Sequence, residues 1–373
     1  MRLRSVFSAG ALLAAVAVPA DSIHAAPPTS SRVVAAAATA AVASQPSTFW
    51  ISHEIIPGER LDEIADRYEV SIDSILRWNQ LDPNRPQFWI GEKLRIQTRF
   101  PDHTREKLTY FVHPHDSWES IAKRFGVSRE QLRDAWNPQE PTLKQGHQLT
   151  LWIEHGTLEQ ITSSEPVFTL QPVPAGGQSV GWPDSGRLLN AVQIPENPAL
   201  YKVRNPEHGY GSTHAIEVMQ RGFATFRSRT GYDRDIIIWD MSTLRGGSYG
   251  PHRSHRSGRD VDIGLPLRPE WHHGMSPIGA VDWETTWHLV RALVETGEVR
   301  YVFLSRGGQL GLYKAARACG ATPAELERII QWPRTEHVGI VRESPGHTGH
   351  IHVRFTCGLD EPACREIGAT AGT

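Results

Sequence analysis

The sequence has 373 residues, of which 21% are charged and 39% hydrophobic, and its formal net charge at pH 7 is -2. The length allows two or three domains, and the composition excludes a fibrous or wholly disordered chain. A charge so close to zero gives no electrostatic reason to expect nucleic acid or an anionic membrane surface as a partner.

The N-terminal segment predicts export. Two arginines precede an apolar run from Val6 to Val18, a secretory signal pattern that is too short to span a bilayer comfortably. We expect residues 1–26 to be the signal peptide, cleaved after Ala20 or near Ala26, with an uncleaved anchor as the alternative. We expect no integral membrane segment after cleavage and a periplasmic or cell-surface protein. Residues 27–47, rich in Ala, Ser, Thr and Pro, predict a flexible tether.

Two related segments follow with a period of about 57 residues. Each has apolar residues at helical spacing, a tryptophan-asparagine pair and a Gly-x-x-Leu run, with short alternating segments on either side. The unit therefore predicts strand, helix, helix, strand. The segments resemble lysin-motif (LysM) domains, predicted at 48–98 and 107–154. This resemblance implies binding of N-acetylglucosamine-containing glycans, such as peptidoglycan, through the loops after the first strand and before the last one.

A mixed polar stretch at 155–175 predicts a linker, and residues 176–373 predict the last domain. Its pattern mixes helices and strands, which indicates an α+β domain. The helices are expected at 215–224, 284–298 and 323–331, the last capped by Thr322, and the strands at 235–240 and 299–304.

Two histidine-bearing stretches near the C-terminal end carry the candidate site. Residues 350–355 alternate polar and apolar side chains with period two, as in a half-buried strand, so His350 and His352 share one face. Earlier in the chain, a loop with His252 and His255 leads into another alternating segment that contains Asp262. Imidazole, carboxylate and imidazole with a fourth position left open is a ligand set of catalytic zinc.

The same residues carry a family resemblance, on the run His252-x-x-His255-x-x-Gly258-x-Asp260-Val261-Asp262 and the downstream His347-x-x-His350-x-His352. From about Pro172 to Cys364 the chain resembles the penicillin-insensitive murein endopeptidases of the lysostaphin, D-Ala-D-Ala-carboxypeptidase and hedgehog superfamily. The resemblance implies a hedgehog-like zinc domain with a central antiparallel sheet.

The resemblance also implies site roles. His255, Asp262 and His352 match the zinc ligands, and His350 matches the histidine that works beside the metal. His347 and His252 match further active-site histidines, with His252 a less secure ligand near a second metal described in some members. For that second metal, Asp282, His272 and His273 are only candidates, and the histidine pair is left out of the site.

Asp260 and the three cysteines complete the set of candidate residues. Asp260 is expected to cap or orient its loop, or else to hold a ligand histidine. An exported chain with three cysteines can form one disulfide. Cys357 and Cys364 lie close together across Gly358 and Pro362, and the resemblance favours this pair, which leaves Cys319 buried at a helix end.

The function that follows is a secreted zinc murein endopeptidase that cuts peptide cross-links of peptidoglycan. The resemblance implies the D-alanyl to meso-diaminopimelyl bond, with the LysM units holding the enzyme on its polymeric substrate. One alternative is a wall-binding or scaffold protein without catalysis. Another is a D-Ala-D-Ala carboxypeptidase or an L,D-endopeptidase on the same zinc core.

Overall fold

The computed structural model describes residues 47–366 except 85, 115, 165–167, 249, 251 and 272–277. The predicted signal peptide, nearly all of the predicted tether, and His272 and His273 lie outside the described residues. Among the described helices, none combines the length and the apolar character needed to cross a membrane.

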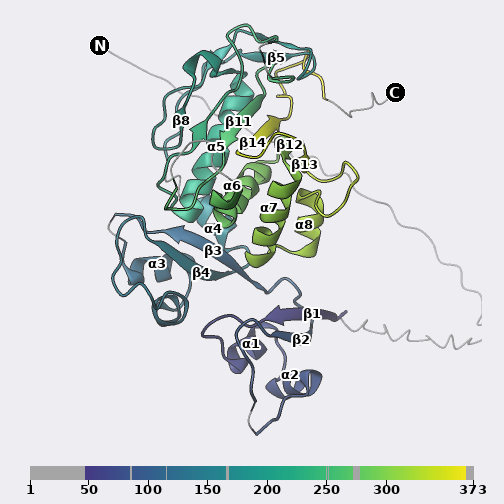
Figure 1. Ribbon diagram of the computed structural model, residues 1–373. Helices are drawn as coiled ribbons and strands as arrows, with labels where there is room; N and C mark the ends of the chain where they lie inside the picture. Colours follow the sequence, from purple (N-terminus) through teal and green to yellow (C-terminus); the bar gives the residue numbers. More distant parts are fainter. Residues whose placement is uncertain are drawn as a thin grey trace, which may run out of the picture. The chain divides into compact units, whose positions relative to one another are not determined.

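The first repeat folds as predicted, with two helices packed on a two-stranded antiparallel sheet (Figure 1). Its elements are β1 (Phe49–Glu54), α1 (Leu61–Arg67), α2 (Ile72–Asn79) and β2 (Lys93–Thr98). Ser71 begins α2, because its hydroxyl accepts the backbone N–H of Ser74. The apolar residues spaced along the helices and strands form a small core of their own.

The second repeat has the same order: β3 (Arg105–Phe111), α3 (Trp118–Phe125), the π-helix η1 (Gln131–Trp136) and β4 (Gln148–Glu154). A reciprocal capping box between Ser117 and Ser120 begins α3. This repeat also has a separate core around Leu108, Tyr110 and Phe125. The prediction of two strand-helix-helix-strand units is confirmed.

One feature of the second repeat was not predicted: its sheet packs on the C-terminal domain. Phe111 is buried in the main core of that domain, and its ring meets Tyr232 edge-on at a centroid distance of 5.1 Å. The backbone N–H of Lys107 donates to the carbonyl of Cys319 at 3.1 Å, and the Lys107 ammonium pairs with Glu284 at 2.7 Å. The second repeat is therefore joined to the C-terminal domain by apolar, backbone and ionic contacts.

A buried ion pair lies in this interface. Glu106 Oε2 accepts from Arg291 Nη1 at 2.6 Å, and Glu106 Oε1 lies 2.5 Å from His155 Nδ1. The Glu106 and Arg291 side chains are only 5% and 7% exposed. Burial alone would raise the pKa of Glu106, but the His155 hydrogen bond and the Arg291 charge lower it to about 2.

This low pKa predicts an acid-sensitive interface. The ion pair stabilises the fold above the unfolded-state pKa of Glu106, near 4.5, and that stabilisation is lost as the pH falls to about 2. We expect the wild type to lose about 3 kcal/mol more unfolding free energy over this window than Glu106→Gln. Denaturant unfolding at a series of pH values measures the difference. Glu119→Gln, at a side chain 80% exposed, is the control, and parallel curves for wild type and Glu106→Gln would contradict the prediction.

The C-terminal domain is built on a six-stranded sheet of order β13-β12-β14-β11-β10-β8. The strands are β8 (Lys202–Val203), β10 (Ile237–Ile238), β11 (Asp260–Gly264), β12 (Val299–Leu304), β13 (Val341–Glu343) and β14 (His350–Phe355). The inner pairs are antiparallel, as predicted, but both edge strands pair in parallel, so the sheet is mixed.

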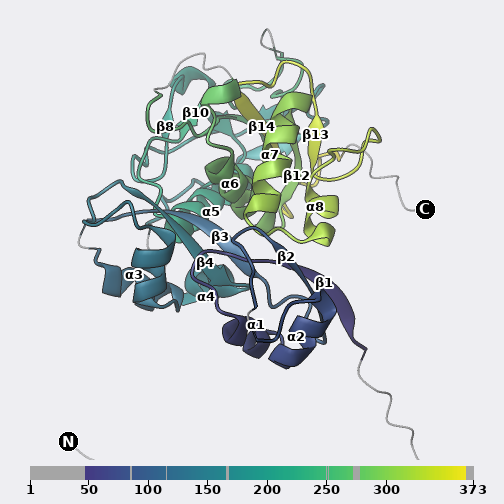
Figure 2. The same cartoon turned by 60° about the horizontal axis from the view of Figure 1, so that its bottom comes forward.

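Helices cover one face of this sheet (Figures 1 and 2). They are α5 (Thr213–Thr230), α6 (Trp283–Glu295), α7 (Arg306–Ala318) and α8 (Pro323–Ile329). The alternate residues Val261, Ile263, Ile351 and Val353 point into the core with α5 and α6. The residues between them, including Asp262 and His352, consequently lie on the opposite face.

The remaining elements are short. They are α4 (Thr157–Ser164), β5 (Gln178–Val180), β6 (Arg187–Leu189), β7 (Val192–Gln193), β9 (Tyr210–Gly211) and the 3₁₀ turns η2 (Pro206–His208) and η3 (Ile278–Ala280). The predicted linker at 155–175 thus contains a helix, α4. The predicted strand at 235–240 shrinks to β10, while the predicted helix at 215–224 extends to all of α5.

Candidate metal centre

Asp262 and His352 face each other across the antiparallel pair β11 and β14. Both side chains are buried, and Asp262 Oδ1 lies 3.2 Å from His352 Nδ1. Directly opposed residues on an antiparallel pair bring their side chains within reach of one shared ligand. The strand register therefore places two of the predicted metal ligands side by side.

His255 reaches the same point from the loop before β11. It is a non-glycine residue in the left-handed backbone region, with φ of 68°, a conformation that costs free energy and is concentrated at functional sites. The Ser242 hydroxyl fixes this conformation by donating to the His255 carbonyl at 2.5 Å. The His255 side chain is 1% exposed, and its Nε2 lies 3.3 Å from Asp262 Oδ1.

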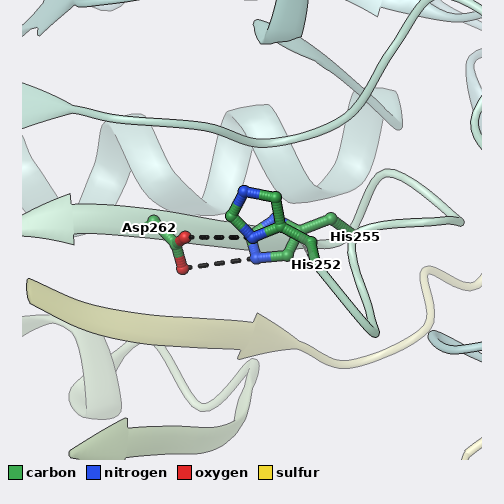
Figure 3. Close-up of side chains that lie close together, drawn as sticks. All are labelled: His252, His255 and Asp262. Atoms are coloured by element: carbon green, nitrogen blue, oxygen red, sulfur yellow. Dashed lines mark ion pairs between the residues drawn. The ribbon is translucent and has the colours of Figure 1, made fainter. Parts of the chain in front are cut away.

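Three potential ligand atoms converge in this way, two of them on the His255 and Asp262 side chains drawn in Figure 3. His255 Nε2 and His352 Nδ1 are 3.2 Å apart, and each is 3.2–3.3 Å from Asp262 Oδ1. Ligands bound tetrahedrally at zinc distances of about 2.0–2.1 Å lie roughly 3.3 Å from one another. Asp262 Oδ1 is buried and has no hydrogen-bond donor among the described residues, which is costly unless a cation binds it. The three residues thus fit a zinc ion.

The surroundings fix which nitrogen of each histidine faces the site. His255 Nδ1 lies 2.8 Å from the Met241 carbonyl and His352 Nε2 lies 2.7 Å from Asp260 Oδ1, and both contacts require the histidine to donate. In the neutral tautomers that bind a metal, the other nitrogens carry lone pairs aimed at the site. Asp260, which also accepts from Arg354 Nε, therefore orients His352, a predicted ligand, which agrees with the second of the two roles considered for it.

Electrostatics match this arrangement. Burial lowers the pKa of His352, but the Asp260 hydrogen bond and the charges of Asp260 and Asp262 raise it to about 9. Burial would raise the pKa of Asp262, yet the contacts with His255 and His352 hold it well below its usual range. The site thus contains two buried carboxylates, those of Asp260 and Asp262, that favour a bound cation.

The two other predicted histidines of β14 and its loop border the site. His350 Nε2 lies 3.7 Å from Asp262 Oδ1, and burial lowers the pKa of His350 to about 4. The His347 ring is 4.9 Å from the His350 ring, and burial lowers its pKa as well. Both imidazoles are therefore neutral at pH 7 and can accept a proton.

His252 approaches from the outer side of the loop. Its Nδ1 lies 3.7 Å from Asp262 Oδ2 and its Nε2 lies 3.9 Å from Asp240 Oδ2. Its potential ligand atom groups with those of His255 and Asp262 within 4.8 Å. Burial lowers its pKa too, so a neutral imidazole stands next to the three converging atoms.

Other residues named from the sequence lie elsewhere. Asp282 begins α6, accepting from the Thr285 backbone N–H at 3.0 Å, so its carboxylate caps a helix. Cys357 and Cys364 form a disulfide, and Cys319 is buried at the end of α7. The disulfide follows β14 directly and ties down the chain beyond the histidines.

Comparisons with known proteins agree with this geometry. Residues 179–276 match the family described as penicillin-insensitive murein endopeptidase, and residues 53–97 and 110–152 each match the LysM domain. The chain carries a murein endopeptidase domain preceded by two LysM domains. The family matched by residues 179–276 is one of peptidoglycan hydrolases. Its matched region holds His252, His255 and Asp262, whereas the histidines at 347–352 lie beyond it and are placed by geometry.

Individual relatives carry the same description. Penicillin-insensitive murein endopeptidases of Citrobacter koseri and Escherichia coli are each 26% identical over 214 and 215 residues, covering 52% of this chain and 72% of the relative. That of Yersinia enterocolitica is 24% identical over 212 residues, covering 52% and 71%. A spore cortex-lytic enzyme structure from Bacillus megaterium covers 37% of this chain and only 27% of its own length, with a TM-score of 0.12 and 20% identity, so it carries no structural argument.

The sequence analysis missed residues that the endopeptidase fold brings to the edge of the site. Asp240 is 7% exposed and accepts from His208 Nδ1 at 2.8 Å and from Arg204 Nη2 at 3.1 Å. Trp239 lies against His350, with ring centroids 4.8 Å apart. These residues follow β8 and β10, two short strands that are distant in sequence and paired only by the fold.

Proposed function

We propose that this protein is a periplasmic zinc peptidase that hydrolyses the D-alanyl to meso-diaminopimelyl cross-links of peptidoglycan. The single observation that carries the proposal is the convergence of His255 Nε2, Asp262 Oδ1 and His352 Nδ1 at 3.2–3.3 Å, with both imidazole tautomers preset. The match to murein endopeptidases supplies the substrate class.

A zinc ion held by these three residues would supply Lewis-acid chemistry, polarising the scissile carbonyl and lowering the pKa of water. Proton transfer then falls to the protein. His350, neutral and on the same strand face as His352, is the proposed general base, and in its protonated form it can return the proton to the leaving amine.

His347 and His252 are proposed to assist. His347 Nδ1 lies 3.3 Å from the carbonyls of Ser344 and Pro345, so that nitrogen carries the hydrogen and Nε2 is left as an acceptor. His252, whose Nδ1 lies 3.7 Å from Asp262 Oδ2, either contributes a further ligand or contacts the substrate.

The LysM domains are proposed to hold the enzyme on glycan strands. In the first domain the loop before β2 exposes Trp89 and Ile90, at 71% and 68%, as an apolar surface for a sugar face. The corresponding positions of the second domain are the polar Lys144 and Gln145. Tethering to a polymeric substrate raises the local concentration of cross-links without requiring tight binding at one site.

The test uses purified protein, isolated peptidoglycan and added zinc, with muropeptides separated by chromatography and weighed by mass spectrometry. We expect cross-linked dimers to become monomers with wild type, and not with His352→Ala or after chelation. His350→Ala is expected to retain zinc but lose most hydrolysis, which separates the proposed base from the ligands.

The products also separate the other functions. Release of free D-alanine without dimer cleavage would indicate a carboxypeptidase, and cleavage at an L,D bond would indicate the related endopeptidase. If zinc is bound and sacculi are retained but no muropeptide changes, the hydrolase proposal is wrong and a wall-binding scaffold replaces it.

A further inference from the structure

Arg204, directly after β8, stands at the rim of the metal centre with its side chain 46% exposed. Its guanidinium carbon lies 4.6 Å above the ring of Trp239, a cation–π distance. Among the described residues its guanidinium makes one hydrogen bond, from Nη2 to Asp240 at 3.1 Å. The remaining N–H groups can therefore serve a ligand.

Trp239 is a fixed platform between Arg204 and His350. Its backbone N–H donates to the carbonyl of Asp262 at 2.8 Å. Two glycines leave room for its indole. A Cβ added at Gly264 would lie 2.9 Å from Trp239 Nε1, and one added at Gly349 would lie 3.5 Å from the ring. The indole is consequently set next to His350, the proposed base.

Asp240 fixes the guanidinium from the other side. Burial would raise the pKa of Asp240, but hydrogen bonds from Asn205 and His208 and the Arg204 charge hold it below its usual range. This carboxylate is 7% exposed and lies 3.9 Å from His252, so it connects the rim to the metal centre. An arginine held by a buried carboxylate and an indole loses little further entropy when it binds an anion.

We propose that Arg204, seated on Trp239, binds the free carboxylate that neighbours the scissile bond on the diaminopimelate side. The inference rests on the proposed function, because in that cross-link the leaving amine and a free carboxylate are attached to the same carbon atom. Binding this carboxylate next to His350 orients the amine toward the proton donor. Arg204 is thus a specificity-determining residue that selects the free acid over its amide.

The test compares two soluble cross-linked muropeptide dimers that differ only in whether this carboxyl group is free or amidated. We expect wild type to cleave the free acid with a kcat/KM about 10- to 100-fold higher, as loss of a charge-assisted hydrogen-bonded contact predicts. Arg204→Met should lose this preference, with the free acid falling to the level of the amide. Arg204→Lys, which keeps the charge, should recover part of it.

Arg300→Met is the matched control. Arg300 also lies over an aromatic ring, 5.1 Å above Tyr301, and pairs with Glu366, but it is at the end of β12 remote from His350. Its substrate preference should equal that of wild type. Thermal melts of each variant establish that the fold is intact.

A binding measurement separates the two proposals. Calorimetry with tripeptide products ending in free or amidated diaminopimelate needs no turnover, and only wild type and Arg204→Lys should prefer the free acid. If wild type cleaves neither dimer yet shows this preference in binding, the proposed function fails while the role of Arg204 stands. Equal cleavage of both dimers, or equal binding of both peptides, would overturn the role of Arg204.

Discussion

Replacing Asp262 with alanine is expected to remove bound zinc and to lower kcat/KM on cross-linked muropeptides by at least about 10³-fold. Asp262 Oδ1 takes part in two of the three converging contacts, and without it His255 Nε2 and His352 Nδ1 have no carboxylate beside them. Water activation and carbonyl polarisation both depend on the metal, so both are lost together. Metal content by elemental analysis and dimer turnover by mass spectrometry measure the two effects.

Asp260→Asn is the matched comparison on the same strand. It leaves all three proposed ligands in place but weakens the contact that orients His352, for which about a 10- to 100-fold loss in metal affinity or activity is expected. Excess zinc should rescue Asp260→Asn in part and should not rescue Asp262→Ala. Full zinc occupancy and normal turnover in Asp262→Ala would show that the metal centre has been placed on the wrong residues.

The metal centre shows which parts of a site the sequence can predict. Period-two alternation predicts β14 from His350 to Phe355 because one face of that strand is core, and the shared face of His350 and His352 follows from it. That His255 joins them depends on the left-handed backbone at that residue and on Ser242, neither of which has a periodic signal. The assignment of His255 to the site therefore came from the family resemblance and not from the periodic pattern.

Residues brought together by the pairing of strands distant in sequence could not be predicted from the sequence. Arg204 and Trp239 follow strands of two residues each, and only the parallel pairing of β8 with β10 brings them together. Of helix α7 only the end at Cys319 was predicted, since Gly307, Gly308 and Gly311 disfavour a helix. The fold explains two of these glycines by close packing. A Cβ at Gly308 would lie 2.8 Å from the Leu304 side chain, and a Cβ at Gly311 would lie 2.5 Å from the Trp283 ring.

The sequence did not predict the packing of the second LysM domain on the C-terminal domain, for a different reason. Its contacts use charged residues such as Glu106 and Lys107, which in a sequence resemble an ordinary solvated strand face. Only Phe111 joins the main apolar core, and one aromatic residue at a strand end gives no pattern. An ion-paired interface cannot be distinguished from a surface until its partners are known.

Phe111→Ala is therefore expected to destabilise the endopeptidase domain, although Phe111 belongs to the LysM repeat. Its ring is 2% exposed and packs with α5 and Tyr232, and removing a buried phenylalanine side chain costs about 3–5 kcal/mol. The unfolding transition followed by tryptophan fluorescence should shift as one step, because the repeat and the catalytic domain share this core. Hydrolysis below the transition should stay near wild type, since Phe111 does not contact the metal centre.

Trp89→Ala supplies the contrast within the other LysM domain. Trp89 is 71% exposed, so its loss should leave the free energy of unfolding within about 0.5 kcal/mol of wild type while weakening retention on sacculi. If instead Phe111→Ala leaves the melting of the C-terminal domain unchanged, the second repeat does not share a core with that domain and is joined to it only by the linker. If the shift appears as expected, the second LysM domain holds its proposed glycan-binding loops in a fixed position relative to the proposed catalytic histidines. The choice of cross-link along a strand would then depend on geometry as well as on affinity.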